Sequence, residues 1–136
     1  MTMQQPEANR INIAENDDLV RARARVRDAA IEMGFSPVDQ VRLVTAVSEL
    51  ARNIVRYAET GFMEIRKIVI SGRCGLQVKF EDRGRGIEDI ELAMTDGYTS
   101  GRGLGKGLPG SRRLVDDFEI RSEVGKGTTV VITKWL

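Results

Sequence analysis

The sequence contains no histidine, and this absence removes several kinds of chemistry at once. A serine–histidine–aspartate triad, a histidine-ligated metal site and phosphorylation of the chain on a histidine of its own are all excluded. A general base must therefore be a carboxylate or, less commonly, a lysine, a tyrosine or the single cysteine, Cys74. With one cysteine no disulfide can form within the chain, which is typical of proteins in a reducing, cytoplasmic setting.

Long apolar runs and a strong excess of charge are missing as well. No stretch approaches the ~20 apolar residues needed to cross a membrane, and the polar N-terminus lacks the apolar core of a signal peptide. There are 21 lysines and arginines against 20 acidic residues, a net charge of +1, whereas nucleic-acid-binding domains usually have a clear basic excess. We therefore expect a soluble cytoplasmic protein, one domain over residues 1–136, that binds neither membranes nor nucleic acids.

Hydrophobic periodicity predicts a two-layer α/β sandwich, with helices on one face of a mixed, mostly antiparallel sheet. Asn16 or Asp17 can cap the first helix, and Ser36 followed by Pro37 can start the second. The predicted elements, in chain order, are a strand at 10–14, helices at 16–33 and 37–58, strands at 62–71 and 76–82 joined by a turn at GRCG, a short helix at 87–94, a helix that Pro109 leads, and strands at 117–123 and 128–135.

Five of the fourteen glycines fall in one segment, GRGLGKGLPG, at 101–110. A P-loop would need glycine where Ser100 stands, and serine or threonine where Gly107 stands. The dinucleotide fingerprint G-x-G-x-x-G matches at Gly105, Gly107 and Gly110, but no strand precedes it and no βαβ unit follows it. A glycine loop that leads into a helix offers free backbone N–H groups to an anion. The segment is therefore either a phosphate-binding lid or a mobile structural loop.

A carboxylate ends the predicted strand in EDRGRG, residues 81–86. An ionised carboxylate only accepts hydrogen bonds, so Asp82 could bind the exocyclic amino group of adenine and repel the carbonyl that guanine has at that position. Gly84 and Gly86 would let the backbone approach a base or phosphates. The alternative is an ordinary Asp-Gly turn.

Two further polar positions could serve the same ligand. Glu49 and Asn53 lie four residues apart in a predicted helix, and hence on one face. An asparagine oxygen is a suitable Mg²⁺ ligand, and a glutamate one turn away could take the proton of a hydroxyl that attacks a γ-phosphate. Thr128, in GKGTT at 125–129, could hydrogen-bond near Asp82. A solvated helix face and a plain hairpin turn are the respective alternatives.

The four motifs follow one another in a characteristic order: E-x-x-x-N, D-x-G-x-G, G-x-G-x-G-x-x-G and G-x-G-T. From about Ile11 to Trp135 the chain thus resembles the ATP-binding fold of gyrase, mismatch-repair and chaperone ATPases and histidine kinases, the GHKL superfamily or Bergerat fold. SELARNIVRYA at 48–58 and GRGLGKGLPGSRRLVDDFEI at 101–120 look like the stressosome switch kinases of the RsbT type, which are related to anti-sigma factor kinases. Without a phosphoacceptor histidine or dimerisation helices, a complete sensor histidine kinase is not expected.

The resemblance implies ATP and Mg²⁺ as cofactors and a role for each site residue. Asn53 would coordinate Mg²⁺ bridging the ATP phosphates, Glu49 would act on the substrate hydroxyl as general base or orienter, and Asp82 would bind the adenine amino group. Arg85 departs from the family pattern, in which proline is common at that position. The adenine pocket would be shaped by Gly84, Gly86 and Thr128, and the lid and phosphate-binding helix start by Gly103, Gly105, Lys106, Gly107, Leu108 and Gly110.

The resemblance also implies substrates and partners. Such kinases phosphorylate a serine or threonine on STAS-domain scaffold proteins of the stressosome, and phosphorylation releases them from that scaffold. The free kinase then binds and activates a downstream regulator, such as a PP2C-type phosphatase. Two alternatives are an anti-sigma factor of the same fold and a non-catalytic nucleotide-binding docking module. The arginines between Arg21 and Arg27 are either a solvated helix face or a surface for an acidic partner.

Overall fold

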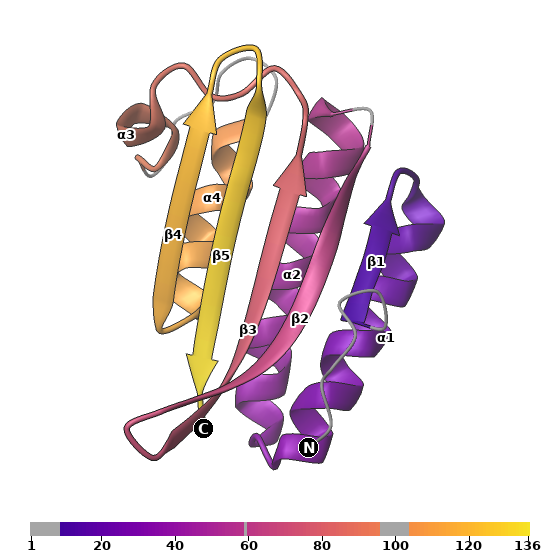
Figure 1. The fold of residues 1–136 in the computed structure, drawn as a ribbon, viewed down its shortest axis with the longest axis vertical. Helices are drawn as coiled ribbons and strands as arrows, with labels where there is room; N and C mark the ends of the chain where they lie inside the picture. Colours follow the sequence, from indigo (N-terminus) through magenta and orange to yellow (C-terminus); the bar gives the residue numbers. More distant parts are fainter. Residues whose placement is uncertain (1–8, 59, 96–103) are drawn as a thin grey trace.

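The computed structural model describes residues 9–58, 60–95 and 104–136. A five-stranded sheet, in the order β1-β2-β3-β5-β4, carries α1, α2 and α4 on one face (Figure 1). The predicted two-layer α/β sandwich is therefore confirmed. The strands are β1 Arg10–Ile13, β2 Gly61–Ile70, β3 Arg73–Asp82, β4 Asp117–Glu123 and β5 Gly127–Trp135, and the helices are α1 Asn16–Met33, α2 Pro37–Tyr57, α3 Ile90–Ala93 and α4 Leu104–Leu114.

The sheet is antiparallel throughout the described part of the chain, rather than mixed. After β3 the chain passes through α3 and α4 and enters β4 in the same direction as β3. The two strands would form a parallel pair if they were neighbours, but β5 lies between them. Because β5 runs opposite to both, each strand pair keeps antiparallel hydrogen bonding.

The start of α1 differs from the prediction that Asn16 or Asp17 caps it. Glu15 is the N-cap residue, and the buried carboxylate of Asp18 accepts hydrogen bonds from the backbone N–H groups of Ala14 and Glu15. A side chain inside the first turn thus binds the free donors that precede the helix. At the other end, Gly34 ends α1 with a left-handed backbone.

The second helix, α2, begins as the sequence predicts. Ser36 accepts a hydrogen bond from the Asp39 N–H at 3.2 Å, and Pro37 occupies the first helical position. The apolar side of α2 lies in the core, next to the inner face of the sheet. The buried residues of α2 and of the facing strands include Leu43, Val47, Leu50, Ile54, Met63, Val78, Phe80 and Ile132.

None of the helices in the described ranges is long and apolar enough to cross a membrane.

The turn between β2 and β3 lies earlier than predicted. It consists of Ser71 and Gly72, which both have a positive φ, at 51° and 80°. This backbone matches the twist of the two strands it joins, so Arg73 and Cys74 belong to β3 instead of the turn. The predicted short helix at 87–94 is real but smaller, because α3 spans only Ile90–Ala93.

The helix after the glycine segment starts earlier than Pro109, contrary to the prediction. It begins at Leu104, so Pro109 lies inside α4. Proline in that position removes one backbone donor, yet Leu108, Pro109 and Ser111 are buried next to α2 and the core. Tertiary packing therefore determines where this helix begins, more than the usual preference of proline for a helix start.

Candidate nucleotide-binding site

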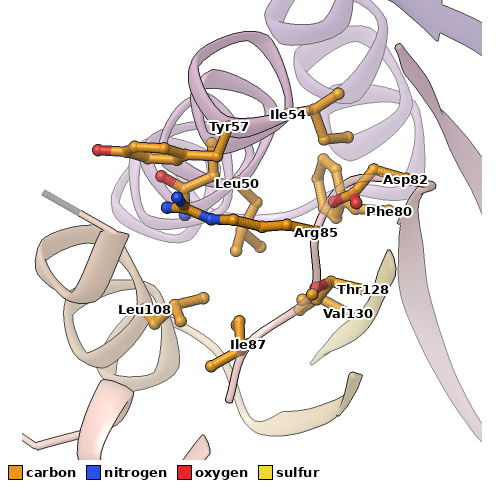
Figure 2. A pocket seen from close by; sticks show the side chains of 12 residues that line it. Leu50, Ile54, Tyr57, Phe80, Asp82, Arg85, Ile87, Leu108, Thr128 and Val130 are labelled. Carbon is orange, nitrogen blue, oxygen red and sulfur yellow. The ribbon is translucent and has the colours of Figure 1, made fainter. Parts of the chain in front are cut away.

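A pocket opens between α2, α4 and one end of the sheet (Figure 2). Its empty space, including the open mouth, is about 480 Å³. Most of the wall is apolar, and a few polar groups point into it. The lining residues are Leu50, Asn53, Ile54, Tyr57, Phe80, Asp82, Arg85, Gly86, Ile87, Leu108, Thr128 and Val130.

Asp82 supplies the carboxylate of the pocket. It lies at the end of β3 and pairs in the sheet with Thr128 of β5. Burial raises the pKa of its carboxyl group, while hydrogen bonds from the backbone of Gly84 and Thr128 lower it, and the nearby charge of Glu81 raises it further. The Gly84 N–H donates to Oδ1 at 2.8 Å. An acceptor is thus held in an apolar pocket with part of its bonding capacity directed at whatever binds there.

The loop after Asp82 is fixed between α2 and the β4–β5 turn. Gly86 has a φ of +79°, and a Cβ there would collide with the backbone carbonyl of Glu123, whose carbon would be 2.7 Å away. A Cβ at Gly84 would lie 3.0 Å from the Tyr57 carbonyl oxygen. The Gly125 N–H donates to the Arg85 carbonyl at 2.8 Å. Close backbone packing therefore requires glycine at position 86, whereas a Cβ at Gly84 would make tight contacts. Of the two glycines, only Gly86 lines the pocket.

We expect Gly86→Ala to lower the free energy of unfolding by about 3 kcal/mol or more, because it combines an unfavourable φ with a backbone collision. Gly125→Ala is a matched control: its φ is +82°, but a Cβ there would meet nothing within 4 Å. That variant should lose only about 1 kcal/mol. Urea denaturation of both variants measures the difference. Equal losses would show that the contact with Glu123 relaxes without cost.

The α2 side of the pocket contributes Asn53. Its Nδ2 atom is buried and has no hydrogen-bond partner among the described residues. Buried polar groups almost always have partners, so an unpaired amide in the wall of a pocket is suited to a ligand. Glu49, one turn earlier, does not line the pocket. Its side chain is 38% exposed and forms an ion pair with Arg52 at 2.7 Å.

Five of the predicted site residues therefore meet in one pocket: Asn53, Asp82, Gly86, Leu108 and Thr128. Three others, Glu49, Gly84 and Gly110, lie outside its wall. A Cβ at Gly110 would meet no described atom within 4 Å, so packing in the described part does not require glycine there. Gly105, Lys106 and Gly107 belong to the backbone of α4, and their side-chain positions lie outside the described part, as does the whole of Gly103.

Sequence reasoning missed the apolar wall and two larger side chains. Tyr57 and Arg85 both line the pocket, and the Arg85 guanidinium carbon lies 5.7 Å from the centre of the Tyr57 ring. Figure 2 shows Arg85 extending from its loop toward α2. The spacing of Leu50, Asn53 and Tyr57 on one helical face could have revealed the tyrosine. No comparable signal marks Arg85, since its neighbourhood depends on how the loop folds.

No group of three or more acidic, cysteine or histidine side chains in the described residues could hold a metal ion. Any Mg²⁺ at this site would therefore obtain most of its ligands from a bound polyphosphate and water, as Mg²⁺ often does. The Asn53 amide lines the pocket, and its nitrogen has no partner in the part of the chain that the structure describes, so it fits such an arrangement. Its oxygen is a hard ligand, and its nitrogen can donate to phosphate oxygens.

Comparison with known proteins agrees with this geometry. The family model of histidine kinase-, DNA gyrase B- and HSP90-like ATPases matches residues 38–136. Serine/threonine-protein kinase RsbT of Bacillus subtilis is 46% identical over 126 residues, which cover 93% of this chain and 95% of that kinase. An anti-sigma F factor of Clostridium kluyveri is 36% identical over 118 residues, 82% of each chain.

Two solved structures share the fold. One contains the RsbU and RsbW domains of a Mycobacterium tuberculosis protein, with a TM-score of 0.60 and 19% identity, covering 92% of this chain and 32% of that one. The other is the histidine kinase domain of a blue-light activated kinase from Erythrobacter litoralis, with a TM-score of 0.54 and 22% identity, covering 85% and 60% of the two chains. The family match and the 46% identity to RsbT show that the chain belongs to the histidine kinase-, gyrase- and HSP90-like ATPases, and within them to the RsbT-type serine/threonine-protein kinases.

Proposed function

We propose that this kinase binds ATP with Mg²⁺ in the pocket between α2 and the sheet and phosphorylates a serine or threonine on a STAS-domain protein of the stressosome. After that phosphorylation the kinase leaves the scaffold and activates a downstream regulator, such as a PP2C-type phosphatase, by binding to it. The convergence of Asn53, Asp82 and Thr128 on one pocket supports ATP binding there most directly. The likeness to RsbT of Bacillus subtilis supports the choice of partners.

The pocket has the groups that an adenine base needs. Its apolar walls, from Leu50 and Ile54 on α2 to Phe80 and Val130 on the sheet, suit the faces of a flat ring. Asp82 accepts a hydrogen bond from the exocyclic amino group, and the same carboxylate repels a carbonyl at that position. Base recognition therefore belongs to the sheet end of the pocket.

The phosphates then extend between α2 and α4. The backbone of Gly105, Lys106 and Gly107 lies in the first turn of α4, where helix N–H groups without intrahelical partners favour an anion. With Gly103 before them and Leu108 and Gly110 after them, these residues hold the phosphates and close over them. Asn53 binds from the α2 side. A bound Mg²⁺ ion would neutralise charge on the transferring phosphoryl group.

Glu49 acts on the attacking hydroxyl. The substrate oxygen forms a bond to the γ-phosphorus while the bond from that phosphorus to the β–γ bridging oxygen breaks, and Glu49 takes or orients the hydroxyl proton. Arg52, at 2.7 Å, holds the Glu49 carboxylate on the exposed side of α2. This position beside the pocket, rather than inside it, suits a residue that meets a protein substrate.

Glu49→Gln should lower the rate of phosphate transfer by about a hundredfold, the usual contribution of a general base, and leave ATP affinity unchanged. Transfer from labelled ATP to a purified STAS-domain protein measures the rate, and calorimetry measures affinity. Glu32→Gln is the control, because that exposed carboxylate pairs with Lys67 and lies on α1. A Glu49→Gln variant that transfers phosphate at the wild-type rate would exclude the base role.

A second function, that of an anti-sigma factor, is favoured by the relatives of that name at 27–36% identity. The two functions differ in what the chain binds. Co-purification from the native cell, followed by identification of the captured proteins and their phosphorylated residues, tests both. Recovery of a sigma factor without a STAS-domain protein would replace the stressosome proposal.

A further inference from the structure

Ser122 joins the two segments that form the base-binding end of the pocket. It lies on β4, opposite Thr128 of β5, and does not itself line the pocket. Its Oγ lies 2.6 Å from the Ile87 N, 3.1 Å from the Gly127 carbonyl oxygen and 2.8 Å from the Thr128 Oγ1. Ile87 and Thr128 do line the pocket, so Ser122 can act on a bound base only through them.

The three contacts determine where the hydroxyl protons are. A serine hydroxyl donates one hydrogen bond and accepts two. The Ile87 N–H can only donate, so it uses one lone pair of Ser122. The Gly127 carbonyl can only accept, so it takes the proton of Ser122. All three contacts are hydrogen bonds only if Thr128 donates its own proton to the remaining lone pair of Ser122.

Thr128 consequently has only lone pairs to offer the pocket. Asp82, its partner in the sheet, is also an acceptor. Two acceptors that line one pocket need hydrogen-bond donors from the ligand, and an amino group on a purine ring supplies two N–H bonds. A ring carbonyl at the same place would meet only lone pairs. If the Thr128 hydroxyl were free to rotate, it could donate to such a carbonyl or to the Asp82 carboxylate.

We propose that Ser122 is a positioning residue that fixes Thr128 as an acceptor and so makes the kinase select a 6-amino over a 6-keto purine nucleotide. This role rests on the proposed binding of ATP in this pocket. Without Ser122, the Thr128 hydroxyl is free to donate its hydrogen bond elsewhere. It then donates either to the Asp82 carboxylate, in a strong charge-assisted hydrogen bond, or to a keto oxygen of the base. Both effects reduce the preference for ATP.

The test compares ATP with inosine triphosphate, in which a carbonyl replaces the 6-amino group and the ring nitrogen N1 carries a proton. Dissociation constants are measured by calorimetry with Mg²⁺ for the wild type, Ser122→Ala, Thr128→Val and the double variant. We expect the ratio of ITP to ATP dissociation constants to fall about tenfold in Ser122→Ala, the effect of roughly one hydrogen bond. This ratio should fall by the same factor in Thr128→Val, and the double variant should have the same ratio as Thr128→Val. Thr129→Val, on the opposite face of β5, should keep the wild-type ratio.

Each outcome of this test has a separate meaning. A Ser122→Ala variant that binds both nucleotides more weakly by the same factor overturns the inference, because a structural defect alone does that. A double variant with a lower ratio than Thr128→Val also overturns it, since Ser122 would then act by another route. If Ser122→Ala does not fold, an unchanged ratio in Thr128→Val overturns the inference instead. A wild type that binds neither nucleotide contradicts the proposed function itself.

Discussion

Asp82→Asn should bind ATP about a hundredfold more weakly than the wild type, yet unfold at the same temperature or a higher one. The affinity falls because a hydrogen bond to a charged acceptor is lost, and the new amide nitrogen faces the adenine amino group as a second donor. The stability is kept because burial disfavours the ionised carboxylate and the neutral amide avoids that cost. Calorimetry with ATP and thermal unfolding without ligand measure the two effects.

The pH dependence of stability gives a further check on the same variant. The raised pKa means that the folded state holds the Asp82 proton more tightly than the unfolded state does. The ionised group therefore destabilises the fold above its folded-state pKa, and this cost disappears as the pH falls toward the ordinary pKa of about 3.9. The advantage of Asp82→Asn in unfolding temperature should shrink over that range.

Glu81→Gln is the matched control for charge. Glu81 is the neighbour of Asp82 on β3 with its side chain on the other face of the sheet, 36% exposed and 3.6 Å from the Lys79 ammonium group. Removal of the Glu81 charge by this substitution should leave ATP affinity unchanged. An Asp82→Asn variant that unfolds at a lower temperature but still binds ATP would mean that the carboxylate serves mainly to hold the Gly84 N–H.

Asn53→Ala should reduce phosphate transfer at least about a hundredfold, the usual effect of removing one group that stabilises the charge of a transition state. The fold should lose no stability, because the Asn53 Nδ2 has no partner within the described ranges and alanine is the better helix former. Transfer of labelled phosphate to a STAS-domain protein, together with urea denaturation, measures both quantities.

The control for Asn53 is Thr45→Ala, an exposed polar residue on the same helix. It should transfer phosphate at the wild-type rate. If Asn53→Ala instead destabilised the fold and kept its activity, the unpaired amide would be structural, and the Mg²⁺ role implied by the resemblance would be wrong for this chain.

Short sequence motifs predict those parts of the fold that depend only on residues close together in the chain. Ser36 and Pro37 start α2 because a cap and a fixed φ act within one turn. Asp82 can be predicted because a carboxylate at a strand end, followed by alternating glycines, indicates a loop whose backbone can approach a ligand closely. The start of α4 at Leu104 could not be predicted in this way, since it depends on the packing of Leu108 and Ser111, which comes from distant residues.

The site is predicted best where one motif carries the chemistry. Asn53, Asp82 and Thr128 each belong to such a motif, and all three line the pocket. The role of the Ser122 hydroxyl could not be predicted from the sequence, because it depends on contacts with residues from two other segments of the chain. Arg85 stands out in the sequence only as a departure from a family pattern, and its place beside Tyr57 follows from the path of the loop.

The position of β5 between β3 and β4 has a consequence for synthesis on the ribosome. A nascent chain that has emerged only as far as β4 already contains α2, Asn53 and Asp82. It still lacks Thr128. The edge of β3 that later pairs with β5 is also unpaired, because β4 joins the sheet only by pairing with β5. Pairings between segments so far apart in sequence form late. The ability to bind ATP should therefore appear only after residues 127–135 have left the exit tunnel and entered the sheet.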